Sequence, residues 1–256
     1  FRQVVENYRL RRSNLTEPVE YYEKLELFRP RYTWADKQTF LSRNQFALLC
    51  RALNPPKAVG LFDKYIFKLF ALHHHLPVAE FYGLFDTGFG FTAEGKPLRT
   101  AADLQELLAR PEVEEFMLKP SSGWKGKGGM LGRVNNDGTL QIAGQDRIAV
   151  EQVFTQMSGT HHSGNRCVDD SWIVESRVRQ HAFFDRYTDS CTQTVRIVTY
   201  LAPDGEVHKL SAVVKLSVAG RWVDSLGEVG MTAPVDDNGV MGTAVRDPFT
   251  GSLDYL

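Results

Sequence analysis

The chain has 256 residues, of which 43% are hydrophobic and 24% are charged, so its composition is that of a folded globular protein and excludes compositional disorder. Its formal net charge of -1 gives no global basic field, and we expect no nucleic-acid partner. No apolar stretch has the length needed to span a bilayer, so we expect no membrane span.

The first part of the chain, residues 1–54, is predicted to be helical. Apolar residues recur at spacings of three and four in "EPVEYYEKLELF" and "DKQTFLSRNQFALLCRAL", and Pro55-Pro56 ends the segment. Another helix is predicted from Asp63, its N-cap, to a point before Pro77. One stripe of this helix contains Phe62, Ile66, Leu69, Phe70 and His73.

The middle of the chain alternates between strand and helix patterns. "VAEFYGLF" is predicted to be a strand, and "RTAADLQELLARPEV" a helix with Thr100 and Asp103 as a capping box. "GMLGRVNNDGTLQIAG" is predicted to be a hairpin that turns at Asp137-Gly138. "DRIAVEQVFTQM" fits a helix or a strand, and the polar stretch "GTHHSGNRCVDDS" is predicted to be a loop.

The last part of the chain is predicted to be mainly sheet. "WIVESRV" is a strand, "CTQTVRIVTYLAPDGEVHKLSAVVKLSV" is a hairpin around Asp204-Gly205, and short strands follow. Helices first, a mixed unit next and sheet last indicate an α+β protein. We expect a helical segment at 1–76, a central lobe at 77–172 and a C-terminal lobe at 173–256.

The cysteines and histidines do not predict a metal site. Cys50, Cys167 and Cys191 are widely spaced and form no CxxC pair, which favours a reducing, cytoplasmic compartment. The run from His73 to His75 points in three directions on a helix, so the preference of a helix C-terminus for cations explains it better than chelation. A second group has zinc-type ligands but no known finger spacing, and a polar loop is favoured. Its members are His161, His162, Cys167, Asp169 and Asp170.

The stretch "FMLKPSSGWKGKGGMLGRV" begins as a strand and then breaks into glycines and lysines. Glycine lets backbone N–H groups converge on an anion, and lysine adds a point charge for phosphate oxygens. The stretch lacks the ending of a P-loop, and it continues into a hairpin instead of a helix. It is predicted to be either a phosphate-binding loop or a lysine-tipped surface loop.

Several stretches, taken together in their order, resemble the ATP-grasp superfamily and, within it, the branch found beside sugar-transfer and exopolysaccharide genes. They are "WADKQTFLSRNQFALLCRALNPP", "DKYIFKLFALHHHLPVAEFYG", "LKPSSGWKGKGG", "IVESRVRQH", "TVRIVTY" and "GMTAPVD". The resemblance covers nearly the whole chain and implies an ATP-grasp fold.

The resemblance also implies an ATP site. Lys64 would contact an ATP phosphate, Lys119 would bind the α- and β-phosphates, and the glycine loop would close over them. The loop residues in this role are Ser121, Ser122, Gly123, Gly126, Gly128 and Gly129. In other interpretations, Lys64 is an exposed lysine of the first helical turn, and the loop is a surface loop.

The adenine hinge and the catalytic cations are implied in the same way. Glu175 to Val178 would form the hinge, with the Ser176 carbonyl accepting from the adenine amino group and the Val178 N–H donating to the ring. A ribose-side contact is implied for His181. The catalytic cations would be Arg196 and Lys215. In other interpretations, Glu175 is a salt-bridge partner at a strand edge, and Arg196, which alternates with β-branched residues, simply faces solvent.

The resemblance implies Mg²⁺ held by an Asp and a Glu-x-Asn on late strands. No Glu-x-Asn occurs after residue 200, and Asp224 and Asp236 lie in the right region but do not replace it. We therefore expect the metal ligands beyond Leu256, and we assign no metal ligand within the chain.

The implied reaction is ATP-dependent ligation through an acyl-phosphate, which an amine or a thiol attacks, in polysaccharide or peptide-like metabolite biosynthesis. Its partners would be ATP, a carboxylate and an amine. Two alternatives stay open: a non-catalytic nucleotide-binding module with a scaffold or regulatory role, and a kinase of the same fold that phosphorylates a hydroxyl. The sequence identifies neither the substrates nor the oligomeric state.

Overall fold

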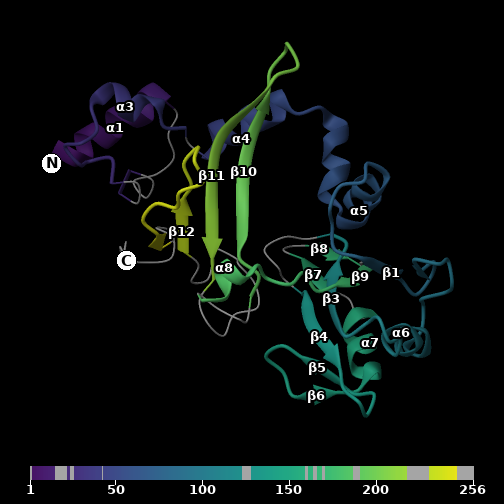
Figure 1. Cartoon of the computed structure of the whole chain (residues 1–256). Helices are drawn as coiled ribbons and strands as arrows, with labels where there is room; N and C mark the ends of the chain where they lie inside the picture. Colours follow the sequence, from purple (N-terminus) through teal and green to yellow (C-terminus); the bar gives the residue numbers. More distant parts are fainter. Residues whose placement is uncertain are drawn as a thin grey trace.

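The structure is a computed structural model, and it describes residues 2–14, 22–23, 26–41, 43–122, 128–158, 161–163, 166–168, 171–186, 191–217 and 231–246 (Figure 1). Its elements are helices and antiparallel strands, which confirms the α+β class. Two sheets lie next to each other, and the segment that begins at Arg177 leads from the larger one toward the smaller one (Figure 1). No helix of the described part is long and apolar enough to cross a membrane.

The N-terminal helices are α1 (Arg2–Asn14), α3 (Trp34–Thr39) and α4 (Arg43–Leu53). The helix expected through "DKQTFLSRNQFALLCRAL" is broken, because α3 ends at Thr39 and Phe40 has an extended backbone. The Phe40 ring packs edge-on against Tyr32, beside a small buried cluster. This cluster consists of Leu10, Tyr22 and Leu27. The aromatic contact accounts for the break, since Phe40 packs here instead of continuing the helix.

A 3-10 helix, η1 (Pro56–Phe62), leads into α5 (Lys64–His73). Asp63 is the N-cap of α5, as predicted, because its Oδ1 accepts from the Tyr65 and Ile66 N–H groups at 2.9 Å each. The helix ends at His73, before Pro77, also as predicted. The apolar stripe of α5 is exposed, however, and the buried α5 residues are Lys68 and Ala71.

The larger sheet has seven strands in the order β2-β1-β9-β3-β4-β5-β6. Their bounds are β1 (Phe81–Phe85), β2 (Phe91–Thr92), β3 (Glu115–Pro120), β4 (Met130–Val134), β5 (Leu140–Ile142), β6 (Arg147–Ile148) and β9 (Trp172–Ser176). Strand β9 pairs with β1 on one side and β3 on the other. Strand β9, most of which falls within the C-terminal lobe that we expected at 173–256, therefore belongs to the same sheet as β1 and β3, and Glu175 lies on a central strand, not at an edge.

Helices α6 (Ala101–Leu108) and α7 (Val150–Ser158) pack against each other and cover this sheet (Figure 1). The Thr100–Asp103 capping box of α6 is confirmed, since each side chain bonds the backbone of the other residue. The core between sheet and helices includes Phe85, Leu104, Phe116, Val153 and Trp172. The hairpin turn at Asp137-Gly138 is also confirmed, with Gly138 at φ 78°.

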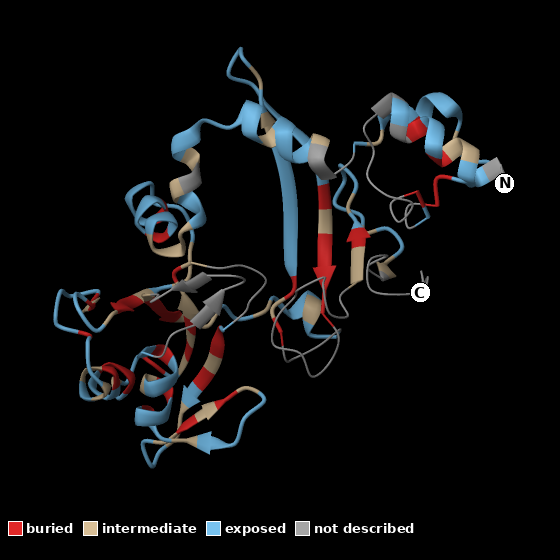
Figure 2. Cartoon of the chain, turned by 180° about the vertical axis from the view of Figure 1, so that it is seen from behind, coloured by how far each residue is buried: buried red, intermediate tan, exposed pale blue. Residues whose placement is uncertain are grey.

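The smaller sheet has the order β10-β11-β12-β13, with β10 (Thr194–Leu201), β11 (Val207–Leu216), β12 (Met231–Pro234) and β13 (Val245–Arg246). Its first hairpin turns at Gly205, as predicted, with φ 89°. Strand β10 is exposed along almost its whole length, whereas the second half of β11 is buried (Figure 2).

The polar stretch expected to be a loop contains a hairpin of its own, β7 (His161–Ser163) and β8 (Arg166–Val168). The loop prediction was therefore wrong for these six positions. The stretch lacks the alternation of apolar and polar residues on which the prediction of a strand depends.

Candidate functional site

The base of the glycine loop is joined to the first turn of α5. Ser121 is buried, and its Oγ donates to Asp63 Oδ2 at 2.6 Å. The Ser121 N–H donates to the Ser171 carbonyl at 2.7 Å, and the Ser121 carbonyl accepts from the Lys64 N–H at 2.9 Å. Ser121 therefore fixes the loop to its surroundings, and its hydroxyl and both of its backbone groups are bonded within the protein.

The Lys64 ammonium lies at the same place. Its Nζ donates to the carbonyls of Pro120 and Ser122 at 2.9 Å each, and it lies 3.4 Å from the Ser121 carbonyl. Lys64 is partly buried, so the alternative of an exposed lysine does not hold. The lysine orders the first peptides of the loop and brings a positive charge to them.

Lys119 reaches the end of β3 beside this loop, and it forms an ion pair with Glu175 of β9. The other Glu175 oxygen, Oε2, lies 2.6 Å from Lys68 Nζ of α5. The side chains of Glu175 and Lys68 are each 6% exposed, whereas that of Lys119 is 37% exposed. Lys119 is therefore the member of this triad that a ligand can reach.

The far end of the loop begins at Gly128, which has φ 76°, a conformation that favours glycine. A Cβ atom there would lie 3.2 Å from Pro120 Cγ, so the two ends of the loop are close together. Gly129 is buried, and Gly123 and Gly126 lie outside the described residues.

The expected adenine hinge continues β9 toward the smaller sheet. The Ser176 N–H donates to the Glu80 carbonyl at 2.9 Å, and Ser176 Oγ accepts from the Glu80 N–H at 3.0 Å. The Val178 carbonyl accepts from Thr192 Oγ1 at 3.0 Å, which ties the segment to the residues that precede β10. The Val178 side chain is half exposed. The segment is thus held at both ends, and its role toward adenine stays a prediction.

His181 is the N-cap of the short helix α8 (Ala182–Asp185), and its Nδ1 accepts from the Phe183 N–H at 3.1 Å. Because Nδ1 is an acceptor in this bond, only Nε2 remains for another partner. The expected ribose contact would therefore have to use Nε2.

Arg196 and Lys215 lie on neighbouring strands of the smaller sheet. Lys215 pairs with Thr194, two residues before Arg196, so Arg196 and Lys215 project from the same face. Lys215 is buried and Arg196 is exposed. The shared face is compatible with a joint role, and their catalytic assignment remains a prediction.

The described residues contain no group of three or more His, Cys, Asp or Glu side chains that could hold a metal ion. Asp236 belongs to a turn, where its Oδ1 accepts from the Asn238 and Val240 N–H groups at 2.9 and 2.8 Å. Asp224 lies outside the described residues, as do Asp169 and Asp170. Mg²⁺ is usually held by one or two carboxylates together with the substrate phosphates, so the location of its ligands stays a prediction.

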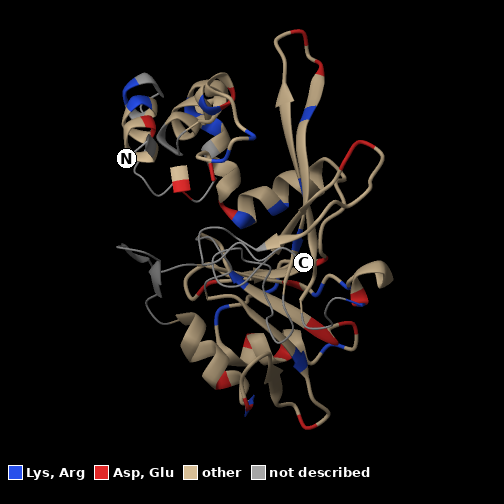
Figure 3. Ribbon diagram, turned by 90° about the vertical axis from the view of Figure 1, so that its left-hand side faces the viewer, with Lys and Arg blue, Asp and Glu red and all other residues tan. Residues whose placement is uncertain are grey.

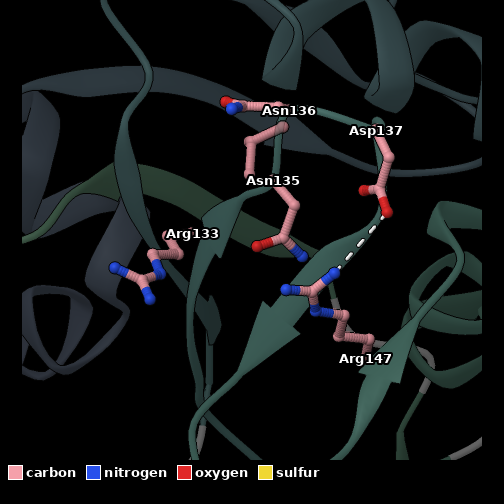
Figure 4. A pocket seen from close by; sticks show the side chains of 6 residues that line it. Arg133, Asn135, Asn136, Asp137 and Arg147 are labelled. Carbon is pink, nitrogen blue, oxygen red and sulfur yellow. Dashed lines mark ion pairs between the residues drawn. The ribbon is translucent and has the colours of Figure 1, made fainter.

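A separate open pocket of about 410 Å³ lies at the β4–β5 hairpin (Figure 4). It is lined by Arg133, Val134, Asn135, Asn136, Asp137 and Arg147. Arg147 pairs with Asp137 at 3.7 Å, and Arg133 points away from this pair (Figure 4). In the pairing of β3 with β4, Arg133 lies opposite Glu115, the first residue of β3, whereas Lys119 lies near the other end of that strand. The pocket is therefore not part of the lysine site.

Sequence reasoning predicted the N-cap role of Asp63, but not its bond to Ser121, and it assigned no role to Lys68. One signal was present, because Lys64 and Lys68 are four residues apart on one helix face, where like charges repel unless a carboxylate lies nearby. Acidic and basic residues are interspersed along the ribbon, in keeping with the net charge of -1 (Figure 3).

Comparison with known proteins gave one family. The model of the sugar-transfer associated ATP-grasp family matches residues 44–249, which is most of the chain and includes both sheets. No curated protein and no solved structure matched the chain.

Proposed function

Because the chain belongs to the sugar-transfer associated ATP-grasp family, we propose that it binds ATP where β3 meets the glycine loop and uses it to activate a carboxylate. Membership of this family supports ATP-dependent chemistry of a ligase or kinase type in general. The ligase reaction, in which an amine or a thiol attacks an acyl-phosphate, is the specific form that we propose.

One observation supports the proposal: Lys119 is an accessible lysine beside the glycine loop. Buried Glu175 holds its ammonium, and buried Ser121 holds the base of the loop. The Lys119 ammonium pairs with Glu175, and the loop starts from peptides that Lys64 and Ser121 fix in place. A cation and a glycine-rich backbone at one place are what a polyphosphate requires. Preorganised charge of this kind is also how enzymes stabilise phosphoryl transfer.

The residues have different roles in this proposal. Lys119 binds phosphate oxygens directly, Lys64 and Ser121 hold the loop, and the segment after Glu175 receives the adenine. Arg196 and Lys215 face the transferring group from the smaller sheet. ATP-grasp proteins generally use Mg²⁺ with ATP, and the metal would neutralise charge on the transferring phosphoryl group.

The test is an assay of ADP release over a panel of carboxylates, with and without added hydroxylamine. Hydroxylamine traps an acyl-phosphate as a stable hydroxamate, so a ligase gives ADP and hydroxamate in equal amounts when its acid is present. A kinase gives ADP and a phosphorylated hydroxyl compound but no hydroxamate. ATP binding without ADP release for any acid or alcohol tested would favour a scaffold and contradict the ligase.

A further inference from the structure

Glu175 is a buried carboxylate that is shared by two lysines. Lys119 contacts its Oε1, and Lys68 Nζ lies 2.6 Å from its Oε2. Both Glu175 and Lys68 are almost fully buried. The cluster of Lys68, Glu175 and Lys119, which we call the lysine triad, thus has two positive charges and one negative charge.

Lys68 is not placed to bind a ligand itself. Its ammonium donates to the Ala79 carbonyl at 2.7 Å in addition to its ion pair with Glu175. The side chain is 6% exposed. The Lys68 ammonium therefore interacts with the protein groups around it and is not accessible to a ligand.

Lys119, in contrast, would share its positive charge between Glu175 and a phosphate, because its ammonium has donors for both. Leaving a buried carboxylate without a partner is costly, because the interior screens its charge poorly. With Lys68 in place, Glu175 keeps a close cation when Lys119 also contacts a phosphate. Without Lys68, Lys119 would be the only described cation paired with Glu175. A phosphate would then have to compete with Glu175 for the Lys119 ammonium.

We propose that Lys68 is a positioning residue for nucleotide binding, because it compensates the charge of Glu175 and so releases Lys119 for the phosphates. This inference rests on the proposed function, since it requires that Lys119 binds ATP. It assigns to α5 a role in the affinity for nucleoside triphosphate, although Lys68 itself does not touch the ligand.

The experiment compares ATP affinity by calorimetry in the wild-type chain and in Lys68→Met, which keeps the length of the buried stem. We expect Lys68→Met to weaken ATP binding about tenfold or more, which corresponds to about 1.4 kcal/mol or more. Lys68→Met/Glu175→Gln should bind ATP within about threefold of Glu175→Gln alone, because Lys68 matters only while the Glu175 carboxylate retains Lys119. Lys68→Arg should stay close to wild type, since it keeps the charge.

A merely structural role for Lys68, through the Ala79 carbonyl, gives a different result. The double variant would then bind ATP more weakly than Glu175→Gln alone, and this outcome would overturn the proposal. So would a Lys68→Met protein that binds ATP as tightly as wild type. If Lys68→Met does not fold, the double variant is compared with Glu175→Gln, because its neutral pair leaves no buried charge. Equal ATP affinity of these two variants supports the proposal, and a lower affinity of the double variant overturns it.

The same series separates this inference from the function on which it rests. A wild-type chain that does not bind ATP contradicts both. A different result separates the two: wild type binds ATP, Lys119→Ala binds it more weakly, and Lys68→Met binds it as wild type does. In that case only the inference about Lys68 fails.

Discussion

Replacing Asp63 should weaken the connection between α5 and the glycine loop. Asp63 caps α5 with one oxygen and accepts from Ser121 Oγ at 2.6 Å with the other. Asp63→Ala removes both, whereas Ser121→Ala removes only the second. Thr100→Ala is the matched control, because the Thr100 hydroxyl caps α6 and, among the described residues, bonds only the Asp103 N–H.

The magnitude follows from these two parts. The loss of an N-cap costs about 1 kcal/mol, and the loss of a hydrogen bond to a charged group costs about 1.5–3 kcal/mol. Because Asp63 is only partly buried, we take the lower end of the sum and expect Asp63→Ala to lower the free energy of unfolding by about 2.5 kcal/mol. Thr100→Ala should lower it by about 1 kcal/mol.

The assay is urea unfolding followed by circular dichroism for wild type, the three single variants and the Asp63→Ala/Ser121→Ala double variant. The double-mutant cycle isolates the bond between the two side chains, and we expect a coupling energy of about 1–2 kcal/mol. A coupling energy near zero, or an Asp63→Ala variant no less stable than Thr100→Ala, would refute the account of this connection.

Two further predictions concern stability away from the lysine triad. Gly83→Ala places a Cβ 2.8 Å from both Leu98 Cδ2 and the Phe91 carbonyl oxygen, so it should lower the free energy of unfolding by about 1–3 kcal/mol. Gly60→Ala is the control and should be nearly neutral, because its Cβ would have no atom within 4 Å. Equal stabilities of the two variants in thermal unfolding would contradict this prediction. The pKa of Asp103 lies below its ordinary value of 3.8, chiefly because the Arg99 N–H donates to it and then because of Thr100. A lowered folded-state pKa contributes stability above the ordinary pKa that is lost as the pH falls through the folded value. The stability difference between wild type and Asp103→Asn should therefore shrink on acidification below the ordinary pKa, and a difference that stays constant with pH would exclude this contribution.

The sequence predicted those features of the fold that depend on local chemistry. The caps at Asp63 and Thr100 and the turns at Gly138 and Gly205 form as expected, because each is set by a few adjacent residues. The stretch that contains Lys119 also begins as a strand, β3, as expected.

The parts that sequence reasoning missed depend on residues far apart in the chain. The periodicity of α5 identified an apolar stripe, but it does not tell which face the rest of the protein covers, and the covered face carries Lys68. The partner of Lys68 comes from β9, so its burial has no local signature. The hairpin of β7 and β8 was missed because its strands are short and polar.

The central claim is that ATP binds at Lys119, and calorimetry with Lys119→Met tests it most directly. The control is Lys96→Met, since Lys96 is an exposed lysine of the same lobe that pairs only with Glu106 at 3.5 Å among the described residues. We expect Lys119→Met to weaken ATP binding by about 1.5–3 kcal/mol, or about 10- to 150-fold, while Lys96→Met binds as wild type does. Equal ATP affinity in Lys119→Met and wild type would contradict the claim.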